Sequence, residues 1–155
     1  YDIQNMIDKA SIENLVNQFV KDNDLFLVAV KVSSSNKITV LADSMKGITI
    51  DECALLHRHI ENGLDREVED FELQVSSPGL EMPFCVIQQY YRNEGRKVAV
   101  IDEEGSKYTG ILRNVTSGGF DLEMEIKQKG KIKEIKILPF NFDQVKSVKE
   151  VLEIR

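Results

Sequence analysis

The sequence has no tryptophan, three prolines and only two cysteines among its 155 residues. Two cysteines are too few for the disulfide framework of a small secreted domain, and neither Cys53 nor Cys85 stands in a CxxC spacing. No apolar run approaches the ~20 residues needed to span a bilayer, and the first residues do not resemble a signal peptide. We therefore expect a cytoplasmic protein without a membrane segment.

Charge is unevenly divided along the chain, although 42% hydrophobic and 30% charged residues are ordinary globular values. Residues 1–83 hold 7 Lys or Arg against 15 Asp or Glu, a net charge of −8. Residues 84–155 hold 13 against 11, a net charge of +2, which together give the −6 of the whole chain. An acidic half repels phosphate and attracts basic proteins, whereas a mildly basic half tolerates RNA. Chance asymmetry in a short chain is the alternative.

The first half predicts five elements in the order α-β-β-α-β. An apolar stripe with helical spacing covers residues 12–20 and extends back toward Ile3, and apolar residues in 25–32 and 38–42 predict a β-hairpin. Thr49 and Glu52 form a capping box before a second stripe, which we expect to be buried: Ile50, Cys53, Leu56, Ile60 and Leu64. Residues 71–75 alternate as a third strand. This order predicts helices over one face of a sheet.

Two prolines and a glycine, Pro78, Gly79 and Pro83, fall within six residues. They stiffen and redirect the chain, so we place a domain boundary here, with an α/β (KH-like) domain at 1–83 and a second domain at 84–155. Pro83 suits the first turn of a short helix through Tyr91, which Gly95 would end.

The second half predicts five short strands, at 97–101, 108–115, 120–126, 132–138 and 145–151, with Pro139 breaking the fourth. Five short strands in so few residues do not easily form a stable open sheet. We therefore expect a small closed β-barrel of the SH3 or Sm type, and an α+β fold for the whole chain.

Several motifs resemble those of the RimP family of bacterial ribosome maturation factors. Residues 73–80, which read LQVSSPGL, resemble its V-S-S-P-G-L signature, and the capped segment 48–53 followed by Arg58 and by Leu64-Asp65 is similar to its second helix. Three stretches resemble its C-terminal domain: 95–98, 110–112 and 142–145. One departure is Met82, where the family has arginine, which puts a phosphate contact there in doubt.

The resemblance implies a non-catalytic factor, without a cofactor, that binds the small (30S) ribosomal subunit during late assembly. The implied partners are rRNA and a basic ribosomal protein, protein twelve of the small subunit, and the implied state is a monomer. A free-standing Sm-like RNA-binding regulator is the alternative, although the G-x-x-G loop of KH domains is absent.

Three groups of residues are candidate partner contacts. At the predicted junction, Ser76, Ser77, Pro78 and Gly79 either contact a partner or only build a type II turn with capping hydroxyls. In the acidic half, Asp65 begins an acidic run to Asp70, and Arg58 lies on the second helix. This run either attracts a basic protein or is merely solvated.

In the second half, four cations could face RNA: Arg92, Arg96, Lys97 and Arg113. Tyr90 and Tyr91 would be available for stacking on bases. A lysine ridge on one hairpin either binds RNA or protects a sheet edge: Lys127, Lys129, Lys131, Lys133 and Lys136.

Enzymatic and metal sites are disfavoured by the residue patterns. The serines have no G-x-S-x-G elbow and no histidine that could serve as a base. Cys53 and His57 share a helix face but lack further ligands, so we expect them to be packing residues, with His59 pointing to solvent.

Overall fold

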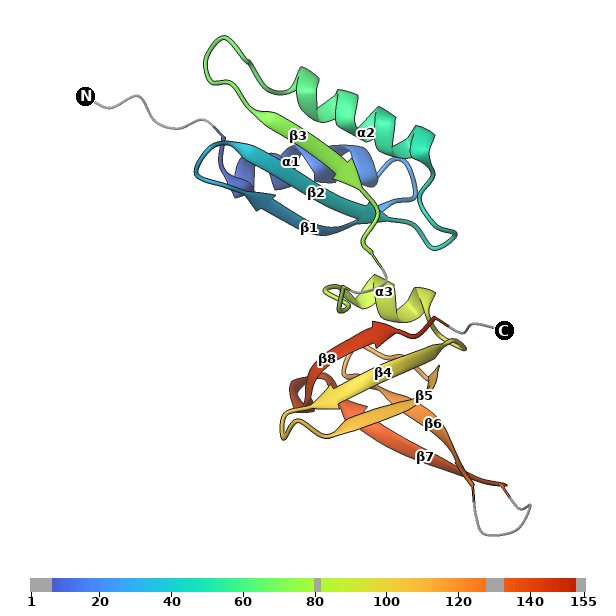
Figure 1. Cartoon of the computed structure of the whole chain (residues 1–155). Coiled ribbons are helices and arrows are strands. Elements are labelled where there is room, and N and C mark those ends of the chain that lie inside the picture. The colour runs from blue at the N-terminus through green and yellow to red at the C-terminus, as the bar shows by residue number, and fades with distance from the viewer. Residues whose placement is uncertain (1–6, 80–81, 128–132, 153–155) are drawn as a thin grey trace. The chain divides into compact units, whose positions relative to one another are not determined.

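The computed structural model describes residues 7–79, 82–127 and 133–152 (Figure 1). The chain divides into two compact units, Tyr1–Pro78 and Gly79–Arg155, and each has its own hydrophobic core. Both units mix helix and strand, so the chain is of the α+β class. The prediction that residues 1–83 and 84–155 are two separate domains stays a prediction. No helix in the described ranges is long and apolar enough to cross a membrane.

The first unit has the predicted order α-β-β-α-β: α1 (Lys9–Val20), β1 (Phe26–Val32), β2 (Lys37–Asp43), α2 (Ile50–Asn62) and β3 (Glu72–Ser76). The sheet order is β1-β2-β3, with β1 antiparallel and β3 parallel to β2. Both helices lie on the same face of this sheet (Figure 1). The two-layer prediction is therefore confirmed for this unit.

Side chains at the helix starts determine where α1 and α2 begin. Asp8 caps α1 by accepting a hydrogen bond from the Ser11 N–H at 2.8 Å, so the helix does not extend back through Asp8. Thr49 and Glu52 form the predicted capping box, with hydrogen bonds of 3.1 and 2.9 Å between each side chain and the other residue's N–H. Capping satisfies N–H groups that the first turn leaves without partners.

The core of the first unit contains Ile12 and Val16 from α1, Leu56 and Ile60 from α2, and Val40 from the sheet. The prediction that Ile50 joins this core is wrong, because its side chain is 88% exposed. Each helical residue advances by about 100°, which places Ile50 roughly 100° from the mean direction of Leu56 and Ile60.

The second unit contains α3 (Ile87–Arg92), β4 (Lys97–Asp102), β5 (Lys107–Arg113), β6 (Gly119–Lys127), β7 (Lys133–Asn141) and β8 (Val145–Glu150). The five strands form one antiparallel sheet in the order β7-β6-β5-β4-β8, with a 3₁₀ turn at Phe142–Gln144. Among the described residues, hydrogen-bonded pairing gives an open sheet with β7 and β8 at its edges. Closure into an SH3-like or Sm-like barrel therefore stays a prediction.

Three boundary predictions in the second unit are wrong. The helix begins at Ile87 and not at Pro83, because the Phe84 N–H bonds the Val148 carbonyl of β8 at 2.7 Å instead of taking part in a helical turn. Strand β7 continues through Pro139 to Asn141, because β7 is an edge strand and an edge tolerates a missing donor. Gly95 has a φ of +86°, but it does not end the helix as predicted, because α3 ends at Arg92 with Asn93 as its C-cap and the Gly95 N–H bonds the Leu112 carbonyl of β5 at 2.7 Å.

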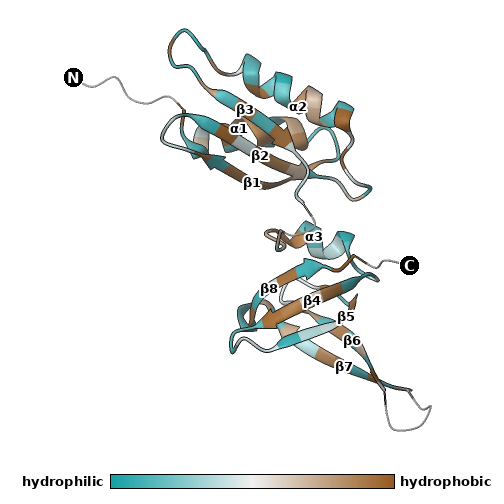
Figure 2. Ribbon diagram, viewed as in Figure 1, coloured by the Kyte–Doolittle hydropathy of each residue, from teal (hydrophilic) through white to brown (hydrophobic). Residues whose placement is uncertain are grey.

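The core of the second unit contains alternate strand residues, among them Val98, Val100, Leu112 and Leu122. The β4 ribbon is largely hydrophobic, whereas the turn that follows it is hydrophilic (Figure 2). This period of two is the pattern from which the strands were predicted.

Candidate functional site

The Ser76–Gly79 segment leaves the end of β3, where Val75 and Ser76 still pair with β2. The Ser77 side chain is exposed, and among the described residues neither Ser76 nor Ser77 makes a side-chain hydrogen bond. The predicted capping by these hydroxyls is therefore wrong. Their hydroxyl groups stabilise no part of the described fold.

The predicted type II turn at Pro78-Gly79 is also wrong. Gly79 does not have a positive φ, and its carbonyl accepts a hydrogen bond from the Met82 N–H at 3.0 Å. A β-carbon added to Gly79 would meet no atom within 4 Å. Steric crowding in the described structure therefore does not require glycine here.

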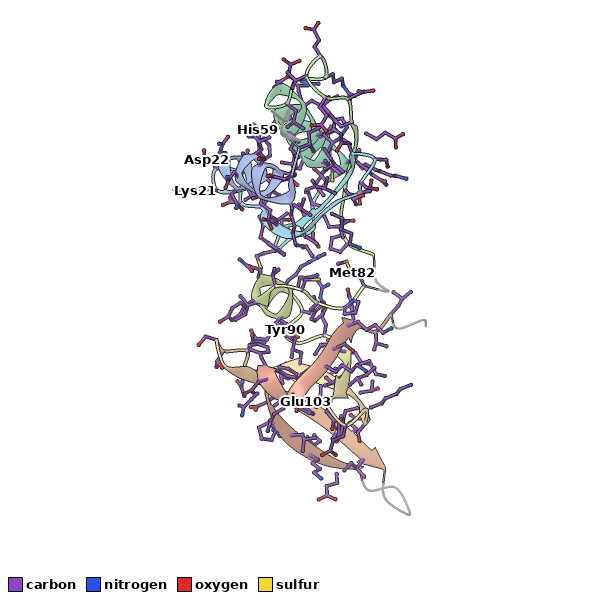
Figure 3. The ribbon with its side chains drawn as sticks, turned by 90° about the vertical axis from the view of Figure 1, so that its left-hand side faces the viewer. Lys21, Asp22, His59, Met82, Tyr90 and Glu103 are labelled. Atoms are coloured by element: carbon purple, nitrogen blue, oxygen red, sulfur yellow. The ribbon has the colours of Figure 1, made fainter. Side chains whose placement is uncertain are left out.

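The α2–β3 connection carries the predicted acidic run. Asp65 is exposed and accepts a hydrogen bond from the Glu67 N–H at 2.9 Å, while Glu69 accepts one from Asn36 at 2.7 Å. The Phe71 backbone N–H and the Arg66 guanidinium hold the pKa of Asp70 below its ordinary value. Figure 3 shows oxygen-tipped side chains projecting from this connection. The site is thus an ordered acidic loop.

Arg66 neutralises only part of this loop, because its guanidinium is directed to Asp70, Glu61 and the Phe71 carbonyl. It donates to the Phe71 carbonyl at 2.6 Å and to Asp70 at 2.9 Å, lies 3.4 Å from Glu61, and stacks 4.0 Å from the Phe71 ring centroid. Arg58 is exposed on α2. The described residues show no ion pair between Arg58 and Asp65, so the structure does not join these two predicted contacts.

Carboxylates in the second unit pair with Arg96 and Arg113. Arg96 lies 3.5 Å from Glu150, and Arg113 lies 3.6 Å from Glu123. Lys97 is opposite Ile111 in the β4–β5 register, so Lys97 and Arg113 share one face of the sheet. Arg92 is half-buried in the last turn of α3. Pairing leaves the surface less basic than the sequence suggested.

The prediction that Tyr90 is available for stacking on bases is wrong. Its ring packs within 6 Å of three phenylalanine rings, with centroid separations of 5.1 Å to Phe84, 5.7 Å to Phe120 and 4.9 Å to Phe142. Figure 3 shows Tyr90 below α3, toward the strands. Tyr91 is 40% exposed and remains accessible. Tyr90 is therefore a partly buried residue packed against the core of this unit, and its ring is not available for stacking on a base.

Burial also predicts how Tyr90 responds to alkali. Desolvation raises the pKa of Tyr90 to about 12, from an ordinary value of 10.0. The folded state therefore favours the neutral phenol. This contribution is complete below the unfolded pKa near 10 and is lost as pH rises toward 12.

We expect the second unit to lose stability over this interval, and Tyr90→Phe to remove that part of the loss. Unfolding midpoints of the full chain at closely spaced alkaline pH values would measure the effect. Equal alkaline slopes for wild type and Tyr90→Phe would contradict it.

Cys53 and His57 have structural roles in the first unit. Burial raises the pKa of the half-buried Cys53 thiol, while the His57 ring joins the Leu73 carbonyl at 3.1 Å to Glu61 at 3.2 Å. His57 thus ties α2 to the edge strand β3. The prediction for His59 is wrong, because α1 packs beside α2 and brings the Phe19 ring to 5.4 Å (Figure 3). The described residues contain no group of three or more potential metal ligands.

The lysine ridge is described only in part. Lys129 and Lys131 lie outside the described residues, and Lys136 is exposed on β7. Beside it, Ile135 and Ile137 are 60% and 54% exposed, which the strand pattern did not predict. Whether the ridge binds RNA or protects this edge stays a hypothesis.

A groove lies beside the acidic loop, and the sequence patterns did not predict it. It has a volume of about 400 Å³ and lies between the start of α1 and the end of α2. The one signal in the sequence was Val68, the single apolar residue in the charged run 65–70.

Comparison with known proteins identifies similar chains. A model of the RimP N-terminal domain matches residues 15–81. Ribosome maturation factor RimP from Porphyromonas gingivalis is 39% identical over 119 residues, covering 77% of this chain and 78% of that protein. The proteins of the same name from Christiangramia forsetii and Chlorobium luteolum are 33% and 32% identical, covering 85% and 92% of this chain and 91% and 95% of theirs.

Proposed function

The chain belongs to the RimP family of ribosome maturation factors, and on that premise we propose that it assists assembly of the small (30S) ribosomal subunit in the cytoplasm. It acts as a monomer and without catalysis. Its partners are rRNA and a basic ribosomal protein, protein twelve of the small subunit. Its two units bind different parts of the immature subunit and together form a clamp.

The observation that carries this proposal is the state of the family signature in the structure. Ser76 and Ser77 use no hydroxyl within the described fold, and Gly79 is uncrowded. Side chains that stabilise nothing locally are free to contact a partner. Pro78 limits the backbone freedom of this segment and so lowers the entropy lost on binding.

Charge separates the roles of the two units. The acidic α2–β3 loop suits a basic protein, while the small net charge of the second unit suits weak contact with RNA. Two modest contacts on one chain bind with useful avidity, yet each is weak enough to release. An assembly factor that must leave the finished subunit needs that property.

Pairing of the cations disfavours the free-standing RNA regulator. A regulator that grips bare RNA needs unpaired basic side chains and an accessible aromatic platform. Arg96 and Arg113 are paired, and Tyr90 packs against the core of the second unit. Tight binding to bare RNA that weakens steeply with salt would instead favour the regulator.

Substitution at Ser77 tests the contact role of the signature. We expect Ser77→Ala to leave the melting temperature unchanged, because this hydroxyl has no hydrogen bond in the described structure. We expect affinity for the precursor small subunit to fall about fivefold, as for one lost interfacial hydrogen bond. Ser117→Ala, at an exposed serine of the β5–β6 turn, is the matched control. Unchanged affinity in Ser77→Ala would show that the signature does not contact the subunit through this hydroxyl.

A further inference from the structure

The groove in the first unit has an apolar floor that is open to solvent. Its lining includes Ile7, Leu15 and Leu64, and its wall includes Val68, which is 58% exposed. Leu15 and Leu64 are partly buried hydrophobic residues that pack against the core. An open apolar hollow of this kind on a small domain marks a place where another side chain can be buried.

Gly63 lets the wall of this groove approach its floor closely. A β-carbon added to Gly63 would lie 2.5 Å from Leu15 Cδ2, so any larger residue would displace the Leu15 side chain. Gly63 also caps α2 and begins the turn toward Asp65. The hollow is therefore a product of close packing between the end of α2 and α1.

The rim of the groove is acidic. Asp65 and Glu69 line it, and Glu67 lies between them in the chain. The Arg66 guanidinium is directed to Phe71, Asp70 and Glu61. The described residues place no cation within 4 Å of Asp65 or Glu67. An apolar floor beside the carboxylates of Asp65 and Glu67 complements a ligand that is apolar at one point and positively charged around it.

We propose that this groove receives an extended, lysine- or arginine-rich segment of a ribosomal protein, with one aliphatic side chain of that segment inserted against Leu15, Leu64 and Val68. The inference rests on the proposed function, because that function supplies a basic protein as the partner. Its occupant differs from rRNA, whose phosphates the acidic rim repels.

The apolar contact is tested with a short lysine-rich peptide that carries one central leucine, and with the same peptide in which serine replaces the leucine. Fluorescence anisotropy would give the affinity of each for the full chain. We expect the leucine peptide to bind about fivefold more tightly, since it buries an aliphatic side chain. Val68→Ser should abolish most of that preference, whereas Ile50→Ser, which alters an 88% exposed residue of the same unit, should not.

The charged rim is tested with Asp65→Asn combined with Glu67→Gln. Asparagine retains an oxygen that can accept the Glu67 N–H hydrogen bond of 2.9 Å, so the loop should keep its shape. We expect peptide affinity to fall about tenfold at low salt and its salt dependence to weaken. Glu103→Gln with Glu104→Gln makes the same charge change in the second unit (Glu103 is labelled in Figure 3) and should have little effect.

Equal affinity of the two peptides, or an unaffected Val68→Ser variant, would overturn the groove as the receptor. Self-association that Val68→Ser removes would also overturn it, because the occupant would then be a second copy of the chain. Failure of the groove is distinguishable from failure of the proposed function. A chain that co-sediments with precursor subunits but does not distinguish the peptides keeps its function and loses this site. A chain that distinguishes the peptides but never binds subunits keeps this site and loses the proposed function.

Discussion

Removal of residues 84–155 is expected to leave a folded first unit whose affinity for the precursor small subunit is lower by about 100-fold or more. The fold should survive because the core of this unit, from Ile7 to Val75, is built entirely within residues 1–83. Affinity should fall because the two contacts no longer share one chain. The second contact then loses the effective concentration that the connection between the units provides.

The truncation needs two measurements on the same sample. Circular dichroism and thermal unfolding would show that the fragment is folded, and sedimentation with precursor subunits would give its affinity. Fragment 84–155 alone should also bind weakly, and an unlinked mixture of the two fragments should not restore the affinity of the intact chain. A first-unit fragment that binds as tightly as the intact chain would refute the clamp.

Tyr90→Ala is expected to destabilise the second unit by about 3 kcal/mol, whereas Tyr91→Ala should change its stability by less than about 0.5 kcal/mol. Tyr90 fills a space between Phe84, Phe120 and Phe142, and its removal leaves a cavity among their rings. Tyr91 is 40% exposed at the next position of the same short helix. These neighbours therefore form a matched pair of the same residue type, one packed against the core and one more exposed.

Denaturant unfolding of the full chain would measure both variants, and subunit affinity would be measured under conditions in which each remains folded. Any loss of affinity in Tyr90→Ala should follow the unfolded fraction, while a loss in Tyr91→Ala would indicate a direct contact with a partner. Similar stability losses in the two variants would contradict the assignment of Tyr90 to the core.

Local patterns were sufficient to predict most elements of the fold. The capping box at Thr49 and Glu52 and the order of helices and strands along the chain follow from patterns within short stretches of sequence. Tertiary contacts explain some of the errors, whereas the error at Ile50 follows from its angular position on α2. The hydrogen bond between Phe84 and Val148 joins residues that are separated in sequence by the strands β4 to β7. A short window of residues therefore cannot reveal it.

The candidate site was harder to predict than the fold, because it depends on which charged groups find partners. A sequence presents Arg96 and Arg113 as a basic patch, but the fold brings Glu150 and Glu123 to them. The opposite error concerns Ser76 and Ser77, where capping was expected and the fold uses neither hydroxyl. The groove at Val68 lies between the start of α1 and the end of α2. The apolar periodicity of either helix alone therefore does not predict it.

In the proposed function, two units with different charge recognise an immature small ribosomal subunit. The most direct test is co-sedimentation of the intact chain with purified small subunits, precursor against mature, at one fixed salt concentration. We predict retention on the precursor and at least about tenfold weaker binding to the mature subunit, a difference of roughly 1.4 kcal/mol. Equal binding to both, or binding to neither, would contradict it.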